Sequence, residues 1–160
     1  MNSKTLIAYF SASGVTAHVA EEMAKATGAD LYEIRPQQPY TAADLNWLDK
    51  KSRSTIEMND PDCQPCHCRS CKNMDEYDTV FVGFPIWWYV EPRIIDTFLE
   101  SYDFSGKTVI PFATSGGSSI KRSEESMKNH CPKGFMEKKA AFSTDQEPLN
   151  GQRACYNAYI

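Results

Sequence analysis

The chain has 160 residues, which is enough for one domain and too few for two of ordinary size. Its 17 Lys and Arg residues against 21 Asp and Glu residues give a formal net charge of −4. This mild acidity argues against binding to nucleic acid or to an anionic membrane, because both require clustered positive charge. A hydrophobic content of 41% is sufficient for a packed core. We therefore expect one domain over residues 1–160, without nucleic-acid or membrane partners.

Neither a signal peptide nor a membrane span is predicted. The first apolar run, residues 6–10, is too short for a signal peptide. The longest apolar run, residues 80–90, is interrupted by Gly83 and Pro85 and is far shorter than the roughly 18 residues that a membrane span needs. We expect a cytoplasmic protein, whose thiols stay reduced.

Strand-like and helix-like patterns alternate along the chain. Continuous apolar runs, which are typical of strands buried on both faces, occupy residues 5–10, 79–84 and 108–113. Residues 30–35 alternate between apolar and polar side chains and predict a strand nearer the sheet edge. Residues 135–142 predict a last strand.

Helical segments separate these strands. The predicted helices cover residues 15–27, 41–56, 91–102 and 118–129. The alternation predicts a three-layer α/β/α sandwich around a mostly parallel sheet with right-handed crossovers. Ligands of such sheets bind outside the carboxyl ends of the strands, so the loops that follow the strands are the candidate site.

The first such loop is rich in hydroxyl groups. It reads Ser11-Ala12-Ser13-Gly14-Val15-Thr16 and runs directly into the first predicted helix. A helix N-terminus offers unpaired N–H groups and the positive end of the helix dipole, which together favour an anion such as phosphate. The loop lacks the Lys of a nucleoside-triphosphate loop and the three glycines of a dinucleotide turn. An ordinary helix cap at Ser11 or Ser13 is the alternative.

Aromatic residues dominate the second loop, Pro85-Ile86-Trp87-Trp88-Tyr89. Neighbouring side chains diverge, so three consecutive aromatic residues in a loop cannot all face one core. We expect some of them to form a stacking platform for a flat ring. Packing of one Trp under the following helix is the alternative reading.

The third loop, Thr114-Ser115-Gly116-Gly117, combines hydroxyl groups with glycines that allow close backbone approach. It could hydrogen-bond the polar edge of a heteroaromatic ring, or it could be a plain glycine-rich turn. The three loops follow three inner strands, and together they predict a site for a phosphorylated molecule with a flat ring.

With these three loops, the chain resembles the flavodoxins and flavodoxin-like FMN proteins of bacteria. Residues 39–45 and 73–78 also look like this group, and the resemblance covers roughly residues 4–132. It implies a five-stranded parallel sheet of order 2-1-3-4-5, an order for which flavodoxin is a standard example.

The resemblance also implies bound FMN. The phosphate would be held by Ser11, Ala12, Ser13, Gly14, Val15 and Thr16. The isoalloxazine ring would be flanked by Pro85, Ile86, Trp87, Trp88 and Tyr89, and its polar edge by Thr114, Ser115, Gly116 and Gly117. No catalytic residue is expected, because the flavin carries the redox chemistry.

Three functions stay open on the sequence alone. The first is electron transfer between partner proteins, with the flavin cycling between its oxidised, semiquinone and reduced states. The second is an FMN-dependent NAD(P)H oxidoreductase that acts on quinones or similar small acceptors. The third is a binding module that has lost its flavin.

Two regions depart from the family pattern. The loop 61–72 holds Cys63, Cys66, Cys68 and Cys71 in two C-x-x-C units. Such units can bind a metal, but the single residue between them makes a tetrahedral site awkward to close, so redox-active thiols or a plain reduced loop remain open.

The segment 135–160 is short where the family ends in a full helix. A homodimer that covers the last strand is therefore one expectation.

Overall fold

Four parallel strands form the centre of the molecule. The structure is a computed structural model that describes residues 3–68, 70–136, 141–142 and 157–159. The strands β1 (Thr5–Tyr9), β2 (Asp30–Glu33), β3 (Thr79–Pro85) and β4 (Thr108–Thr114) lie in the order β2-β1-β3-β4. All three pairings among them are parallel. The expected α/β architecture and the order of the first four strands are confirmed.

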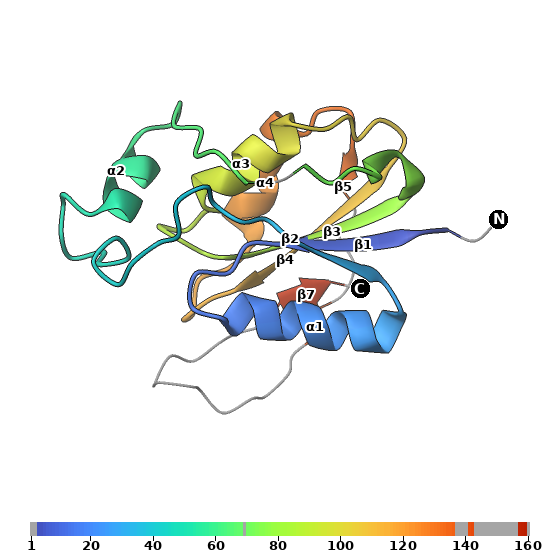
Figure 1. Ribbon diagram of the computed structural model, residues 1–160, viewed down its shortest axis with the longest axis horizontal. Coiled ribbons are helices and arrows are strands. Elements are labelled where there is room, and N and C mark those ends of the chain that lie inside the picture. Colours follow the sequence, from blue (N-terminus) through green and yellow to red (C-terminus); the bar gives the residue numbers. More distant parts are fainter. Residues whose placement is uncertain (1–2, 69, 137–140, 143–156, 160) are drawn as a thin grey trace.

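Helices cover both faces of this sheet (Figure 1). On one face lies α1 (Val15–Thr27), and on the other lie α3 (Arg93–Glu100) and α4 (Lys121–His130). The short helix α2 (Arg53–Asn59) lies to one side of these layers, and a 3-10 turn (Met74–Glu76) precedes β3.

Alternate side chains of the strands pack on the two faces of the sheet. In β1, Leu6 and Ala8 join the core beneath α3 and α4, whereas Ile7 and Tyr9 join the core beneath α1. Both sets are buried, which explains why the sequence shows a continuous apolar run rather than an alternating one. Gly83 in β3 leaves room for the ring of Phe112, because an added Cβ would lie only 2.1 Å from that ring.

The predicted fifth parallel strand, 135–142, is seen only at its ends. The two-residue strand β5 (Phe135–Met136) pairs in parallel with the start of β4. By contrast, β6 (Ala141–Phe142) pairs antiparallel with β7 (Asn157–Tyr159), and β7 pairs antiparallel with the end of β4. A full fifth parallel strand is therefore not shown. The rest of the segment 135–160, and with it the expected dimer contact, lies outside the described residues.

The predicted helix 41–56 is wrong over most of its length. Only Arg53–Asn59 is helical, and turns occupy most of the preceding residues. The reason is that polar side chains bind the backbone: Asn46 Oδ1 accepts from Leu48 N–H at 3.2 Å, and Asp49 Oδ1 accepts from Lys51 N–H at 2.9 Å. Such local bonds offer the backbone an alternative to the helix. Ser52 then caps α2 by accepting from the backbone N–H of Thr55.

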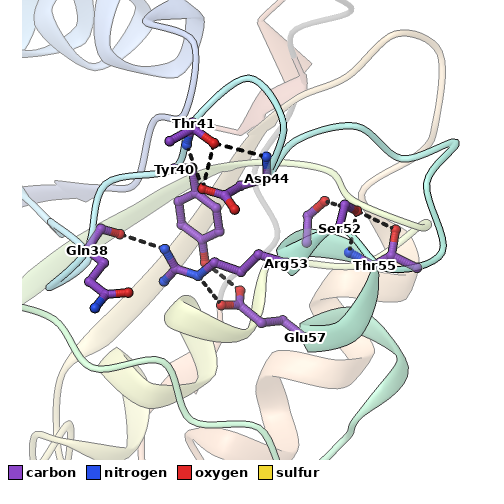
Figure 2. Close-up of polar contacts among 9 residues, drawn as sticks. Gln38, Tyr40, Thr41, Asp44, Ser52, Arg53, Thr55 and Glu57 are labelled. Atoms are coloured by element: carbon purple, nitrogen blue, oxygen red, sulfur yellow. Dashed lines mark hydrogen bonds and ion pairs between the residues drawn. The ribbon is translucent and has the colours of Figure 1, made fainter.

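A polar cluster anchors α2 to the chain that follows β2 (Figure 2). Arg53 Nε donates to Glu57 Oε1 at 2.7 Å, and Arg53 Nη1 donates to the Gln38 carbonyl at 2.7 Å. The Arg53 guanidinium carbon lies 4.0 Å from the centroid of the Tyr40 ring. The Tyr40 hydroxyl donates to the other oxygen of Glu57. Burial and this bond to Glu57 raise the pKa of Tyr40, so the phenol stays protonated.

Replacing Arg53 by Met should loosen this cluster. The Met keeps most of the apolar stem, but Glu57 would remain buried without its charged partner, at a cost of about 1–3 kcal/mol. Hydrogen exchange of residues 38–59 should become faster in Arg53→Met. The matched control is Arg35→Met, because Arg35 pairs with Glu33 on the surface and its loss should change little. Equal exchange rates in the two variants would contradict this role of Arg53.

Candidate functional site

A cavity of about 980 Å³ opens at the carboxyl edge of the sheet. All three loops that the sequence singled out contribute to its wall, together with α2 and the segment that precedes it. The lining residues are Ala12, Ser13, Val15, Leu45, Trp47, Ser54, Pro85, Ile86, Trp87, Trp88, Tyr89, Thr114, Ser115, Gly116 and Ser118. The strand register explains the convergence, because Tyr9 of β1 pairs with Gly83 of β3, and Pro85 of β3 pairs with Thr114 of β4.

The first loop turns sharply into α1 through Gly14. Gly14 has a φ of 91°, a left-handed conformation that glycine adopts without strain. Its N–H donates to Ser11 Oγ at 3.1 Å, which fixes the turn. No side chain caps α1, and its first turn contains no acidic residue. The first N–H groups of α1 are thus left for an anion, and Ser13 lines the cavity beside them.

Thr16 has a different place from the one predicted. Its side chain is buried, and its hydroxyl oxygen lies 2.8 Å from that of Thr114. This bond ties the first turn of α1 to the end of β4. Thr16 therefore holds two loops of the site together and does not line the cavity.

The second loop is a tight hairpin. Trp87 and Val90 exchange both backbone hydrogen bonds, at 2.9 and 3.1 Å. Trp88 and Tyr89 form the two-residue turn with φ values of 49° and 72°, a conformation that Asn and Gly usually supply. Bulky residues there cost of the order of 1–3 kcal/mol each. Such strain is typical of functional sites.

The three aromatic residues of this hairpin divide between core and solvent. Trp87 is half-buried and packs edge-on against Phe10 and Tyr40, at centroid distances of 5.6 and 5.4 Å. Trp88 and Tyr89 remain 38% and 60% exposed. The guanidinium of Arg122, in α4, lies 5.4 Å from the Tyr89 ring centroid. Trp87 thus packs on Phe10 and Tyr40 rather than under the following helix, and the stacking role of the exposed pair stays a prediction.

The third loop is organised by Ser115. Its Oγ accepts from the N–H of Gly117 at 3.1 Å and from that of Ser118 at 2.6 Å. The backbone of Ile86 donates to the Thr114 carbonyl at 2.9 Å, which holds the second and third loops side by side. Ser118 lines the cavity, while Gly117 does not.

Most of the predicted site residues lie on the cavity wall. The exceptions are Ser11, Gly14, Thr16 and Gly117, which shape the loops behind it. Leu45, Trp47 and Ser54 also line the cavity, and the helix predicted over residues 41–56 gives no reason to place them there. Trp47 is 69% exposed, and an exposed Trp beside three predicted ligand loops is the signal that could have identified it.

The wall offers neutral groups to a ligand. Among the described residues, no Asp, Glu, Lys, Arg or His lines the cavity, whereas hydroxyls, backbone amides and aromatic rings do. Such a wall can bind and orient a planar molecule that carries an anionic group, but it holds no acid–base pair.

The four neighbouring cysteines do not form a metal site in this structure. All four are free thiols, and within the described chain no three of their sulfur atoms lie within 4.8 Å of one another. Cys68 Sγ donates to the Pro36 carbonyl at 3.1 Å, beside a second cavity of about 440 Å³ that Arg35 and Glu33 also line.

In the described part of the chain, no helix has the length and apolar composition to cross a membrane.

Comparisons with known proteins agree with this geometry. A family model described as Flavodoxin matches residues 4–147. The structure resembles a candidate flavoprotein from Bacteroides eggerthii, at 54% identity over 85% of this chain and 86% of that one, with a TM-score of 0.83. A candidate flavoprotein from Bacteroides uniformis matches at 51% identity over 86% and 88% of the two chains, with a TM-score of 0.82.

A more distant match indicates the fold alone. It is a flavoprotein from Lactobacillus acidophilus in complex with FMN, 24% identical over 84% of this chain and 90% of that one, with a TM-score of 0.68. No curated protein matches the sequence. Because the family model spans most of the residues, and relatives above 50% identity cover most of both chains, the chain belongs to the flavodoxin family.

Proposed function

We propose that the chain binds FMN in the 980 Å³ cavity and acts as an electron carrier. One observation carries the proposal: the cavity joins the uncapped N-terminus of α1 to a wall of aromatic side chains. The first feature suits a phosphate and the second suits a flat ring. FMN contains both parts, and it is the ligand of the Lactobacillus acidophilus relative.

The end of the cavity beside α1 suits a doubly charged phosphate, although neither Lys nor Arg is among the described residues that line it. Backbone N–H groups at a helix start are strong donors to phosphate oxygens, and the helix dipole adds to the attraction. Ser13 adds a hydroxyl donor. An acidic residue in the first turn of α1 would oppose phosphate binding, and none is present there.

The ring end of the cavity is lined by large aromatic side chains. Trp47, Trp88 and Tyr89 are large exposed aromatic residues on its wall, and stacking of a flat ring would cover them. When bound, FMN supplies one- and two-electron redox chemistry, and the protein tunes it. An apolar wall disfavours added negative charge on the ring, so these residues should lower the reduction potential.

The phosphate part of the proposal is tested by comparing FMN with riboflavin. We expect FMN to bind about 10- to 100-fold more tightly, because each charge-assisted hydrogen bond contributes about 1.5–3 kcal/mol. Quenching of flavin fluorescence on titration measures both affinities. Ser13→Ala should weaken FMN binding and leave riboflavin binding unchanged, whereas Ser105→Ala, outside the cavity, should change neither. Equal affinities for FMN and riboflavin in the parent protein would exclude the assignment of the phosphate loop.

The aromatic hairpin provides a second test. Replacing Trp88-Tyr89 by Asn-Gly should raise the free energy of unfolding by about 1–2 kcal/mol, because Asn and Gly adopt the positive φ values of this turn with less strain than Trp and Tyr. The same change should weaken binding of both FMN and riboflavin, since it removes the stacking surface. Chemical denaturation and fluorescence titration measure the two effects. A variant that gains stability and retains full affinity would show that this pair does not contact the ring.

Kinetics separate electron transfer from NAD(P)H oxidation, because a flavin can take up electrons by either route without an acid–base pair on the wall. The holoprotein should oxidise NADH or NADPH slowly with a quinone as acceptor, and should exchange electrons rapidly with a redox partner protein. Steady-state consumption of the nicotinamide measures this. Rapid turnover without a partner protein would favour the NAD(P)H oxidoreductase instead, with a quinone or similar small molecule as the electron acceptor. A purified protein that is colourless and binds no added FMN would refute both.

A further inference from the structure

A second group of functional side chains lies where the hairpin, α3 and α4 meet. Glu91 follows the hairpin directly, Asp96 lies in the first turn of α3, and His130 is the last residue of α4. One ligand atom from each of these three residues lies within 4.8 Å of the other two. None of the three lines the FMN cavity, so the proposed function does not account for them.

The two carboxylates lack the partners that buried acids normally have. Glu91 is 0% exposed, and its side-chain oxygens have no well-formed hydrogen bond, although the Ser126 hydroxyl and the Asp96 carboxyl group lie close enough to act on its pKa. Asp96 is also buried, and its Oδ1 has no hydrogen bond. Unpaired buried carboxylates are costly and rare, so each calls for a ligand or a proton. Burial and the neighbouring Asp96 raise the pKa of Glu91 to about 8.

The histidine is oriented as metal-binding histidines are. Its Nδ1 lies 2.6 Å from Glu100 Oε1, a contact in which the ring N–H donates to the carboxylate. The lone pair is then on Nε2, which lies 3.7 Å from Asp96 Oδ1. A carboxylate that holds the far nitrogen of a histidine is the usual outer partner of a metal ligand.

Arg93 balances part of the negative charge of the cluster. Its guanidinium lies 3.4 Å from Asp96 Oδ2 and also donates to the Met58 carbonyl at 3.2 Å. It therefore contacts Oδ2 of Asp96, whereas Oδ1, which lies 3.7 Å from His130 Nε2, has no hydrogen bond. The C-terminus of α4, where His130 lies, favours positive charge as well.

We propose that Glu91, Asp96 and His130 bind one Zn²⁺ ion, with a water molecule in the fourth position. Imidazole nitrogen and carboxylate oxygen are both zinc ligands, with bonds of about 2.1 Å. Tetrahedral ligand atoms are then about 3.4 Å apart, and the 3.7 Å between His130 and Asp96 is close to this value. The ion would join α3 to α4 and fix the base of the aromatic hairpin, and it would enter from the side of the half-buried His130.

Zinc titration of the full chain tests the site. Cysteine thiolates also bind zinc, so the parent for this test carries Cys63→Ser, Cys66→Ser, Cys68→Ser, Cys71→Ser and Cys155→Ser and keeps Cys131, whose side chain is buried. Calorimetry and elemental analysis after gel filtration should find one Zn²⁺ per chain. Glu91→Gln and His130→Gln should each weaken binding at least about tenfold, and Glu100→Gln about 10- to 100-fold. The matched control is His18→Gln, because His18 lies on α1, and it should bind as the parent does.

Thermal unfolding separates loss of the ion from loss of the fold. In EDTA, Glu91→Gln should melt at the same temperature as the parent or higher, because it buries an amide instead of a carboxyl group that resists burial. At equal concentration, added Zn²⁺ should raise the melting temperature of the parent more than that of Glu91→Gln. The proposal is overturned if the parent binds no zinc, or if Glu91→Gln and His130→Gln bind it as tightly as the parent. In that case Glu91 and Asp96 share a proton instead. Neither result depends on FMN.

Discussion

The parallel pairing of β1, β3 and β4 is the constraint on which the site depends. The register ends β3 and β4 at the same level and β1 two residues earlier, so the loops that follow them meet at one edge of the sheet. Burial of both faces fixes the register, because a slip by one residue would exchange the core beneath α1 with the core beneath α3 and α4. The cavity is thus a consequence of strand packing. Bonds between the loops, such as that between Thr16 and Thr114, then hold its walls in place.

The strands and their loops could be predicted from the sequence because their signals are local. Continuous apolar runs predict strands buried on both faces, and the topology of parallel sheets places the following loops together. The segment 41–52 could not be predicted in this way. Its side-chain bonds from Asn46 and Asp49 compete with the helix that its composition suggests, and periodicity does not measure that competition. Trp47 was therefore assigned to a helix although it lines the cavity.

The role of a hydroxyl group also depends on contacts that the sequence does not contain. Ser13 and Thr16 belong to one motif, and both suit a phosphate on chemical grounds. In the structure Ser13 is exposed at the cavity, whereas Thr16 is buried against Thr114 from a strand far along the chain. The same distinction separates Trp87, which packs on Phe10 and Tyr40, from Trp88 beside it. A motif thus identifies the loop, while packing decides which of its members face the ligand.

The residues proposed to bind zinc form a cluster that no sequence motif indicates. The four cysteines are close in sequence, yet the structure does not bring three of their sulfur atoms together. Glu91, Asp96 and His130 match no spacing motif, because they come from a hairpin, the start of one helix and the end of another. Packing of α3 against α4 brings them together, and burial removes the water that would otherwise solvate them. Burying two acids beside a histidine is unfavourable unless a proton or a cation accompanies them. A bound ion would offset the unfavourable burial of the two acids, and it would also stabilise the strained hairpin that they adjoin.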